Sequence, residues 1–554
     1  MEDKRNLILA IVLCLIILIG WGPLAQYMGW VQIPDPAEVA RQQEAAQQQA
    51  QQDAAKAEAR QAEAAKAAAL PAFTPAEGRD LHIDSPLYEA VLYTGGGPLR
   101  SFRLKQFHTE LSQDSPLVNM VDEYTAAVAP LGLVINGQPS WSTGLWSLES
   151  PSTAQELQTG QQTVVRLAGI VDNLRVEREL TFSADTYLIK EKLRLANTGE
   201  QARSARVRYT VAADASNASG SQYDAMRIAW DLDGSLDEES SESTLRETGV
   251  QASGKIYWAG AMSTYFMAAI LPGDPNGVSL KGLVQRSVYR AAVEEPEIFL
   301  NPGESRELSV SYWIGPKERN LLLGVSDELA KSIDLGMFSV IAKALIWLLS
   351  FFYAYVHNWG VAIILLTILI KAVFWPLTAK SYASMEKMKK LQPMMQTLRE
   401  KYKDDKERMN KEVMALYKAY GVNPASGCVP ILIQLPVFFG LYQALLTAIE
   451  LRHAPFLTHL PFTDIAWLTD LSAKDPLYIT PIIMGVTMFL QQKMSPPAAD
   501  PTQQKIMMAL PIVFTVLFLG FPSGLVLYWL VNNILSILQQ WLMMRKTKTL
   551  RDAA

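Results

Sequence analysis

The sequence predicts a polytopic α-helical membrane protein that carries an exported all-β domain. Two observations predict this fold class. Long apolar runs occur near the N-terminus and again after residue 337, whereas short alternating runs fill the region between them. The charges divide at the same place: residues 6–337 carry 27 Lys and Arg against 41 Asp and Glu, and residues 338–554 carry 21 against 12. An acidic soluble body joined to a basic membrane body explains both patterns, and the acidic charge argues against nucleic-acid binding by the first body.

The N-terminus predicts a membrane anchor followed by a linker. Lys4 and Arg5 precede an apolar run that is long enough to span a bilayer. Basic residues beside a span are retained in the cytoplasm, so residues 1–28 are expected to form an uncleaved anchor with the N-terminus inside. Residues 29–78 are expected to be a low-complexity linker, because 34–70 is rich in Ala, Gln and Glu and almost free of large apolar side chains.

The pattern over residues 79–318 predicts an antiparallel β-sandwich. Alternating runs such as LRVERELTF (174–182) and LIKEKLRLANTG (188–199) are separated by Gly, Pro, Asn and Asp, which is typical of sandwich strands and turns. The domain has two histidines, His82 and His108, without a recognisable nucleophile and base. Both cysteines of the chain lie in apolar runs outside the domain, which excludes a disulfide framework or metal cluster there. We therefore expect no enzyme activity, no cofactor and no metal.

The chain after residue 357 predicts five membrane spans. The first is 358–378, and four more fall within 425–545. The stretch between them, 379–424, is strongly basic, with 11 Lys and Arg against six acids over 380–420. Because such loops are retained inside, this loop and the tail 546–554 are expected in the cytoplasm.

The connecting region 319–357 contains one more apolar run, at 338–355. If that run crossed the membrane, the basic loop would lie outside, because the N-terminal anchor already supplies one crossing. The run is therefore expected to lie as an amphipathic helix in the outer membrane–water interface.

The cytoplasmic loop predicts an antiparallel helical hairpin. Apolar positions recur every three or four residues on both sides of the KDD stretch at 403–405. The predicted seam contains Met385, Met388, Gln392, Met395, Leu398 and Tyr402 on the first helix and Met409, Val413, Leu416 and Tyr420 on the second. A plain two-helix seam is one interpretation. The other is a methionine-rich partner surface, with a basic face that meets RNA or anionic lipid; its contact residues would be Met385, Met388, Met395, Lys389, Lys390 and Met409.

Four segments of the membrane body together resemble one known family. They are NWGVAIILLTILIKAVFWPLTAKSYASMEKMKKLQP, VNPASGCVPILIQLPVFFGLY, DPLYITPIIMGVTMFLQQKMSP and FPSGLVLYWLVNNILSILQQ. They are similar in sequence and order to the membrane core of the bacterial YidC branch of the YidC/Oxa/Alb insertase family. The resemblance covers about 318–545, and the anchor followed by a large exported domain is similar to the Gram-negative form. It implies a five-helix insertase core around a groove, a β-super-sandwich in the periplasm, and a place in the bacterial inner membrane.

Polar residues inside the spans indicate where such a groove would lie. Thr367 and Lys371 are four residues apart and share a helix face. Gln434 lies between two prolines of a later span. The last span is interrupted by Tyr528, Trp529, Asn532 and Asn533. Each residue alone has a plain explanation as an interhelical hydrogen bond or an interface aromatic, but together they suit a wet cavity within the membrane.

The resemblance implies that Thr367, Lys371, Gln434 and Trp529 face the groove, and Tyr528 and Asn532 are assigned to it as well. The family usually has arginine where this chain has Lys371, so the charge is kept and the planar two-pronged donor is lost. The functional hypothesis is that this charge draws acidic or polar segments inward. Snorkelling towards the cytoplasmic interface past Trp375 is the other interpretation of Lys371.

The resemblance implies that the chain inserts and folds nascent membrane proteins, alone or with the Sec translocon. Its further partners would be the ribosome, the signal-recognition machinery and membrane lipids. Two alternatives remain open from the residues. A secondary transporter would also place a charge within broken spans, and a mutarotase-like exported domain would suggest a membrane-anchored carbohydrate-active protein.

Overall fold

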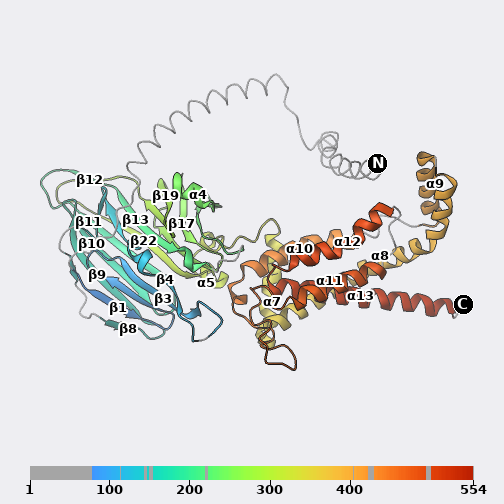
Figure 1. Ribbon diagram of the computed structural model, residues 1–554. Coiled ribbons are helices and arrows are strands. Elements are labelled where there is room, and N and C mark those ends of the chain that lie inside the picture. Colours follow the sequence, from blue (N-terminus) through green and yellow to red (C-terminus); the bar gives the residue numbers. More distant parts are fainter. Residues whose placement is uncertain are drawn as a thin grey trace, which may run out of the picture. The chain divides into compact units, whose positions relative to one another are not determined.

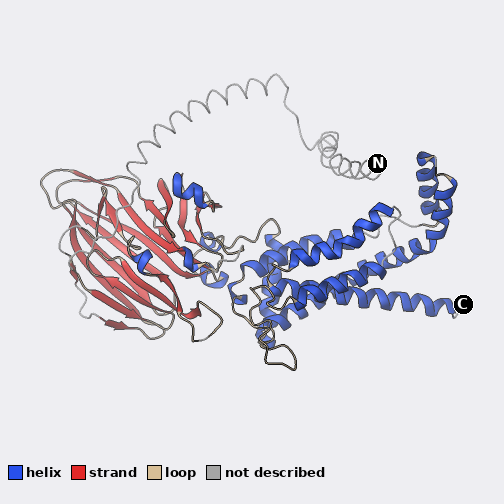
Figure 2. Cartoon of the chain, viewed as in Figure 1, coloured by secondary structure: helices blue, strands red, loops and turns tan. Residues whose placement is uncertain are grey.

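The computed structural model describes residues 78–552, apart from 113, 143–145, 149–153, 219–222, 404, 422–428 and 495–500. The predicted N-terminal anchor and nearly all of the predicted linker lie outside these residues. The described chain begins with an all-β domain and continues as long helices (Figures 1 and 2).

The all-β domain contains three sheets of five or more strands and one short ladder. The five-stranded sheet has the order β4 (Leu117–Val121), β3 (Leu99–His108), β2 (Tyr88–Tyr93), β1 (Asp80–Asp84) and β8 (Ala154–Glu156). The six-stranded sheet has the order β16 (Val250–Gly254), β19 (Val278–Gln285), β20 (Val288–Glu294), β13 (Val207–Asp214), β5 (Leu133–Ile135) and β6 (Gln138–Pro139). The short ladder pairs β12 (Arg203–Ala205) with β21 (Ile298–Leu300).

The largest sheet has nine strands. Its order is β15 (Ser235–Glu239), β14 (Arg227–Leu232), β17 (Ile256–Met262), β18 (Phe266–Pro272), β22 (Ser305–Pro316), β11 (Leu188–Ala196), β10 (Leu174–Ser183), β9 (Gln162–Val171) and β7 (Ser147–Leu148). Along β9 and β11 buried residues alternate with more exposed ones, so one face of the sheet covers the core. Except for the parallel pair β1–β8, the ladders are antiparallel, which confirms the predicted β-sandwich.

Short helices interrupt and close the domain: α3 (Glu123–Ala126), α4 (Glu242–Glu247), α5 (Arg319–Leu323) and α6 (Asp327–Ala330). Trp258 of β17 donates from Nε1 to the carbonyl of Glu328, which attaches α6 to the sheet. The domain therefore extends past its last strand into the region that precedes the membrane helices.

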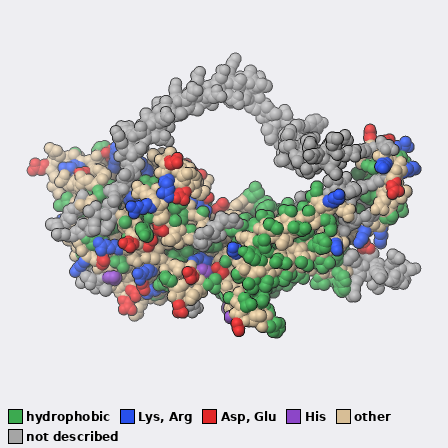
Figure 3. All heavy atoms as spheres, viewed as in Figure 1, with side chains coloured by type: hydrophobic (Ala, Val, Ile, Leu, Met, Phe, Trp, Pro, Cys, Tyr) green, Lys and Arg blue, Asp and Glu red, His purple; other side chains and the backbone are tan. Residues whose placement is uncertain are grey.

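Seven longer helices follow in the described part of the chain, and α9 is the shortest of them: α7 (Ser339–Val356), α8 (Trp359–Lys401), α9 (Lys406–Ala419), α10 (Val429–Thr447), α11 (Ile479–Met494), α12 (Pro501–Phe518) and α13 (Ser523–Asp552). By length and composition, three stretches of the described chain could each cross a membrane: Ser339–Val356, Trp359–Leu391 and Ser523–Met543. Hydrophobic side chains cover much of the helices' visible surface, whereas charged side chains are spread over the β domain (Figure 3). This is the surface expected of a membrane body beside a soluble one.

The turn between α7 and α8 sets the direction of the first long helix. His357 ends α7 in the left-handed region, with φ of 49°. Asn358 then caps α8, because its Oδ1 accepts a hydrogen bond of 3.0 Å from the Val361 amide. In Figure 1, α7 runs across the end of the helices at which α8 begins.

Helix α8 continues well past the predicted span, through Pro376 and Pro393, and ends at Lys401. The next helix starts at Lys406, where Asp405 caps it by accepting from the Arg408 amide. The stop and restart predicted at KDD is confirmed. The predicted hairpin is thus built from the end of α8 and from α9.

Candidate functional site

The polar residues predicted within the spans meet where α8, α10 and α13 pack together. The Lys371 ammonium donates to Ser536 Oγ at 2.7 Å. The Ser536 hydroxyl in turn donates to the Asn532 carbonyl, also at 2.7 Å. Gln434 Nε2 donates to the Tyr528 hydroxyl and to Asn532 Oδ1, each at 3.0 Å. One hydrogen-bonded set, Lys371, Gln434, Tyr528, Asn532 and Ser536, therefore joins three helices; we call it the polar cluster.

The polar cluster lies deep along the helices. Lys371 comes twelve residues after the start of α8, or about 18 Å at the usual helical rise. Ser536 comes thirteen residues after the start of α13, or about 20 Å. A hydrocarbon core is about 30 Å thick, so a helix that begins at one membrane face carries these residues near the middle.

Lys371 is held inside the helix bundle. Its ammonium bonds a buried hydroxyl on α13, which does not match the snorkelling interpretation. Within the part of the chain that the structure describes, no carboxylate forms an ion pair with this lysine. The ammonium therefore has a neutral oxygen partner and keeps its charge uncompensated.

The Ser536 hydroxyl acts as a hydrogen-bond acceptor towards Lys371. The hydroxyl donates its proton to the Asn532 carbonyl one turn earlier, so towards Lys371 its oxygen acts as an acceptor. We did not predict this residue from the sequence. The signal was present: Ser536 is four residues after Asn532 and hence on the same helix face.

Thr367 lies one turn before Lys371 on α8. Its side chain is buried, and its hydroxyl donates to the Ile363 carbonyl of the same helix at 2.6 Å. This bond satisfies the hydroxyl locally, as is common for threonine in apolar helices. Thr367 thus shares a helix face with Lys371, and its hydroxyl bonds its own helix rather than the polar cluster.

Trp529 contacts aromatic side chains. Its ring lies 4.6 Å from that of Phe438, 5.2 Å from that of Phe518 and 6.1 Å from that of Phe514. The neighbouring residue Tyr528 points its hydroxyl at Gln434 instead. Tyr528 therefore belongs to the polar cluster and Trp529 to an aromatic cluster, since successive residues lie about 100° apart around a helix.

Further polar contacts extend along α13 beyond the polar cluster. Gln539 Nε2 donates to Thr378 Oγ1 of α8 at 2.8 Å, and Gln540 Nε2 donates to the Met494 carbonyl of α11 at 3.0 Å. The side-chain oxygens of both glutamines are buried and have no hydrogen-bond partner among the described residues. Buried acceptors of this kind normally find a donor, so this seam favours added water or a polar ligand.

The hairpin has a small apolar seam. Its buried residues are Leu391, Met395 and Tyr417, with Met388, Val413 and Leu416 packed against them. Tyr420 was predicted in this seam, but it is 52% exposed. Tyr417 is buried in the seam instead, since it lies four residues after Val413 and therefore on the same helix face.

The predicted partner-contact residues divide between the seam and the surface. Met395 is buried and Met388 packs beside it, so both stabilise the hairpin. Lys389 and Lys390 are exposed, and Lys390 lies 3.6 Å from the Glu386 carboxylate. Met385 and Lys389 line a small pocket between α8, α11 and α13. Met409 is half-buried, and the more exposed methionines of the hairpin are Met394 and Met414.

Two family models together match most of the chain. The model described as 60Kd inner membrane protein matches residues 351–550, and the model described as YidC periplasmic domain matches residues 80–348. The boundary between them falls within α7. The β domain is therefore periplasmic and the helices after it belong to the bacterial inner membrane.

Curated relatives match along nearly the whole length. A protein of Nitratidesulfovibrio vulgaris (strain DP4), named membrane protein insertase YidC, is 55% identical over 546 residues, which are 99% of this chain and 100% of the relative. The protein of the same name from Lawsonia intracellularis is 49% identical over the same shares. The one from Geobacter metallireducens is 39% identical over 85% of this chain and 88% of the relative. These names do not favour the transporter or carbohydrate-active alternatives.

Solved structures give weaker likenesses. The one titled active YidC insertase with the first transmembrane domain resolved is 17% identical, covers 85% of this chain and 94% of its own, and has a TM-score of 0.36. A galactose mutarotase-like protein from Lactobacillus casei is 9% identical over 43% of this chain and 100% of its own, with a TM-score of 0.32. The assignment rests on the family models and the relatives: the chain belongs to the YidC family of membrane protein insertases.

Proposed function

We propose that the chain inserts nascent membrane proteins by offering their exported polar segments a hydrated, positively charged groove at the polar cluster. The observation that carries this proposal is the Lys371 ammonium, which is held by the Ser536 hydroxyl and paired with no carboxylate among the described residues. A charge within a membrane is costly and is usually functional. Left uncompensated, it is available to an acidic group of a client.

The groove lowers the barrier to insertion because it shortens the distance that the client's exported segment crosses without water. An exported hydrophilic segment loses water when it enters hydrocarbon, and each unsatisfied polar group raises its free energy. Donors and acceptors at Gln434, Asn532, Ser536 and Gln539 would replace part of that water. The apolar segment of the client can then leave sideways into lipid. No covalent chemistry is required, so we propose that the protein is not an enzyme.

The exposed apolar surface of the helices supports this sideways exit. On α12, Ile512, Val513, Val516 and Leu517 are all exposed, and on α8 the same is true of Val373 beside the polar cluster. A client helix could contact such a surface and lipid at once. Lipid partitioning, translation and the membrane potential would drive the process.

We also propose that the hairpin receives clients in the cytoplasm. Lys389, Lys390 and the exposed methionines Met394 and Met414 present charge and adaptable apolar surface together. The ribosome, the signal-recognition machinery and the Sec translocon are partners that such a surface suits. This arrangement requires α7 to lie in the outer interface, which its course across the end of the bundle supports (Figure 1).

The course of α7 has a direct test. Lys343 and Ser350 are both exposed, seven residues apart on the helix. With α7 in the outer interface, Lys343→Cys and Ser350→Cys both react with a membrane-impermeant thiol reagent applied from the periplasmic side. Reaction of either variant only from the cytoplasm contradicts the proposed topology.

The groove charge is tested with two clients that differ only in acidic residues of their exported segment. We expect Lys371→Ala to reduce insertion of the acidic client about tenfold, which is the effect of a charge interaction across roughly 12 Å at an effective dielectric constant of about 20. Lys371→Arg should retain activity because it keeps the charge, and Lys371→Glu should be at least as harmful as alanine. Insertion is measured by protection of the exported tag in cells depleted of their own insertase. Equal loss for both clients, or none for either, would reject the charge mechanism.

A further inference from the structure

The loop between α10 and α11 contains a narrow projection, residues 456–468, which we call the finger. Its two sides are joined by backbone hydrogen bonds: Phe456 N to Leu468 O at 2.9 Å, and Leu460 N to Ile465 O at 2.8 Å. Between these bonds, His459 and Ala466 form an antiparallel bridge. The finger is therefore a short hairpin with a defined shape.

The base of the finger is fixed to the membrane helices. Asn358, the cap of α8, donates from Nδ2 to the Phe456 carbonyl at 3.1 Å. Trp467 is buried and donates from Nε1 to Asp475 Oδ1 at 3.0 Å, and Asp475 also accepts from the Thr480 amide at the start of α11. Gly360 leaves room for the Phe456 ring, since a Cβ there would lie 2.2 Å from a ring carbon. The base is thus held at the end of the bundle where α8 and α11 begin.

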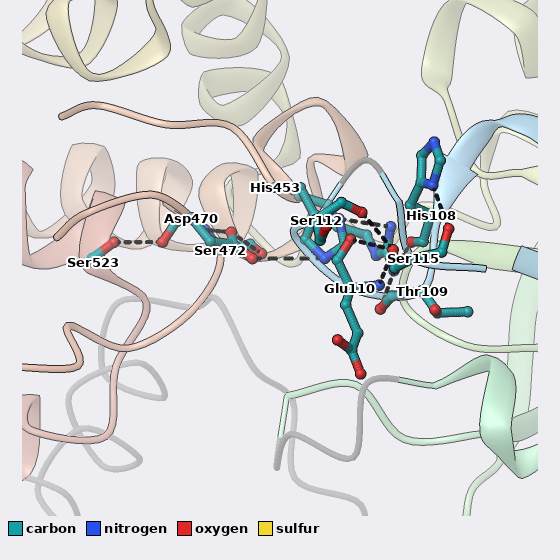
Figure 4. Close-up of polar contacts among 10 residues, drawn as sticks. His108, Thr109, Glu110, Ser112, Ser115, His453, Asp470, Ser472 and Ser523 are labelled. Atoms are coloured by element: carbon teal, nitrogen blue, oxygen red, sulfur yellow. Dashed lines mark hydrogen bonds and ion pairs between the residues drawn. The ribbon is translucent and has the colours of Figure 1, made fainter. Parts of the chain in front are cut away.

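A second set of contacts holds the following residues, 470–472. Ser472 and Ser523 are joined to Asp470 in Figure 4: the Ser472 hydroxyl donates to the Asp470 carboxylate at 2.7 Å, and the Ser523 hydroxyl donates to its carbonyl at 2.9 Å. Ser523 is the first residue of α13. The chain beside the finger is therefore attached to a third helix at the same end.

The tip of the finger is apolar and uncovered. Phe462 is fully exposed, and Ile465 is 51% exposed. The turn beneath them is closed by the Thr463 hydroxyl, which donates to the Leu460 carbonyl at 3.0 Å. Phe462 has a φ of 67°, a conformation that side chains other than glycine rarely adopt. The fold thus holds a strained aromatic residue outward from a rigid base.

We propose that the finger is a membrane-interface anchor, which places Phe462 and Ile465 among the lipid headgroups and upper acyl chains. Its base belongs to the end of three membrane helices, so its tip is at the level where lipid headgroups meet that end. The exposed side chains of α7, which crosses the same end, are of the same kind: Trp347, Phe351 and Tyr355. Trp and Tyr are enriched at this depth, and Phe enters the boundary between headgroups and acyl chains on interfacial helices.

The polar residues of the tip also fit an interface. Thr463 and Asp464 lie between Phe462 and Ile465 in the sequence and are exposed, as is His459 on the finger's side. A carboxylate is tolerated among hydrated headgroups but not in the hydrocarbon core. The tip therefore suits shallow insertion, which would limit tilting of α8 and α11 while a client passes. This role is independent of the insertion step and is tested without a client.

The test measures the depth of the tip in the full chain within phosphatidylethanolamine–phosphatidylglycerol vesicles. Cys14 and Cys428 are replaced by serine, and a spin label is attached to Ile465→Cys, which leaves Phe462 in place. Val516→Cys on the lipid-exposed face of α12 and Phe299→Cys, an exposed aromatic position of the β domain, are the references. We expect the label at 465 to collide readily with oxygen and poorly with a water-soluble nickel chelate, as at 516 and opposite to 299.

A second variant tests the residue that anchors the tip. Phe462→Asp should raise nickel collisions at 465 to the level seen at 299, and Phe299→Asp should leave the label at 465 unchanged. Nickel access at 465 equal to that at 299 before substitution would show a tip in water and overturn the proposal. Poor access to both oxygen and nickel would show a tip covered by protein, such as a second copy, and would also overturn it. A label that stays deep in the Phe462→Asp variant would overturn the role of Phe462.

Discussion

Two basic side chains, the buried Arg178 of the β domain and the half-buried Lys371 of the membrane helices, have different hydrogen-bond partners. Arg178 of β10 is wholly buried and faces Glu191 of β11, with its Nε 2.6 Å and its Nη2 2.9 Å from the two carboxylate oxygens. It also donates to the carbonyls of Gly96 and Leu131. Among the described residues, Lys371 has one side-chain hydrogen bond, to Ser536. The charge of Arg178 is paired with a carboxylate of the fold, whereas that of Lys371 is not paired with any carboxylate of the described residues.

For these two residues, the difference separates a buried ion pair of the fold from a charge with a neutral partner. Glu191 also accepts from the Tyr312 hydroxyl at 2.8 Å, so its carboxylate binds both Arg178 and Tyr312. Such a pair is costly to break because either partner alone becomes an unpaired buried charge. Lys371 instead resembles a binding site that awaits its acidic partner. The comparison predicts stability effects in the β domain and client effects in the helices.

The largest effect should follow from breaking the buried pair. We expect Arg178→Met to lower the free energy of unfolding of the β domain by roughly 3–5 kcal/mol, because Glu191 is left buried without a partner. Arg166→Met, which breaks the exposed pair with Glu179, should change it by less than about 0.5 kcal/mol. Both are measured by urea unfolding of the purified full chain.

The double variant sharpens the same test. Arg178→Met with Glu191→Leu removes both charges and should recover part of the lost stability, since no unpaired ion remains. Equal, small effects for Arg178→Met and Arg166→Met would mean that the buried pair is not a structural element, and the contrast with Lys371 would fail.

A smaller effect should come from a buried acid that has no ion-pair partner among the described residues. Glu295 follows β20, and burial, assisted by the nearby Asp274, raises the pKa of its carboxyl from 4.5 to about 7. Between these values the folded chain binds more protons than the unfolded chain, so the free energy of unfolding falls as pH rises. Between pH 5 and 7, we expect the free energy of unfolding of Glu295→Gln to fall by roughly 1–2 kcal/mol less than that of the wild type.

The pH window is chosen to isolate Glu295. Burial lowers the pKa of Lys317 to about 7, which makes stability rise with pH above that value and opposes the Glu295 contribution there. Urea unfolding of wild type and Glu295→Gln at pH 5, 6 and 7 gives the difference directly. If the free energy of unfolding had the same pH dependence in both proteins, Glu295 would not have a raised pKa in the folded state.

The two regions also differed in how far the sequence could predict them. Strand periodicity indicated the β-sandwich, yet it could not reveal Arg178 and Glu191 as a pair, because alternation places residues on a face and does not select cross-strand partners. In the helices, polar residues within apolar runs marked Thr367, Lys371 and Gln434. Their partners were harder to find: a serine such as Ser536 is unremarkable in a sequence until Lys371 is placed opposite it.

The smallest effect we predict concerns Ser536 as a positioning residue for the groove charge. Ser536→Ala removes the acceptor of the Lys371 ammonium, and we expect about threefold lower insertion of the acidic client, near the lower end of the net value of a hydrogen bond. Ser536→Thr should preserve insertion because it keeps a hydroxyl that can bond the Asn532 carbonyl. Thr447→Ala on α10 is the matched control, since its hydroxyl makes the same kind of bond to Gln443 without a charged partner.

Combining Ser536→Ala with Lys371→Ala distinguishes a positioning role of Ser536 from a structural role. If Ser536 acts through Lys371, Ser536→Ala should add no further loss to Lys371→Ala, and it should leave the client with the neutral exported segment unaffected. A structural role predicts equal loss for both clients and additive effects with Lys371→Ala. The insertion assay with the two clients measures both, and additive loss would mean that Ser536 supports the helix packing rather than the charge.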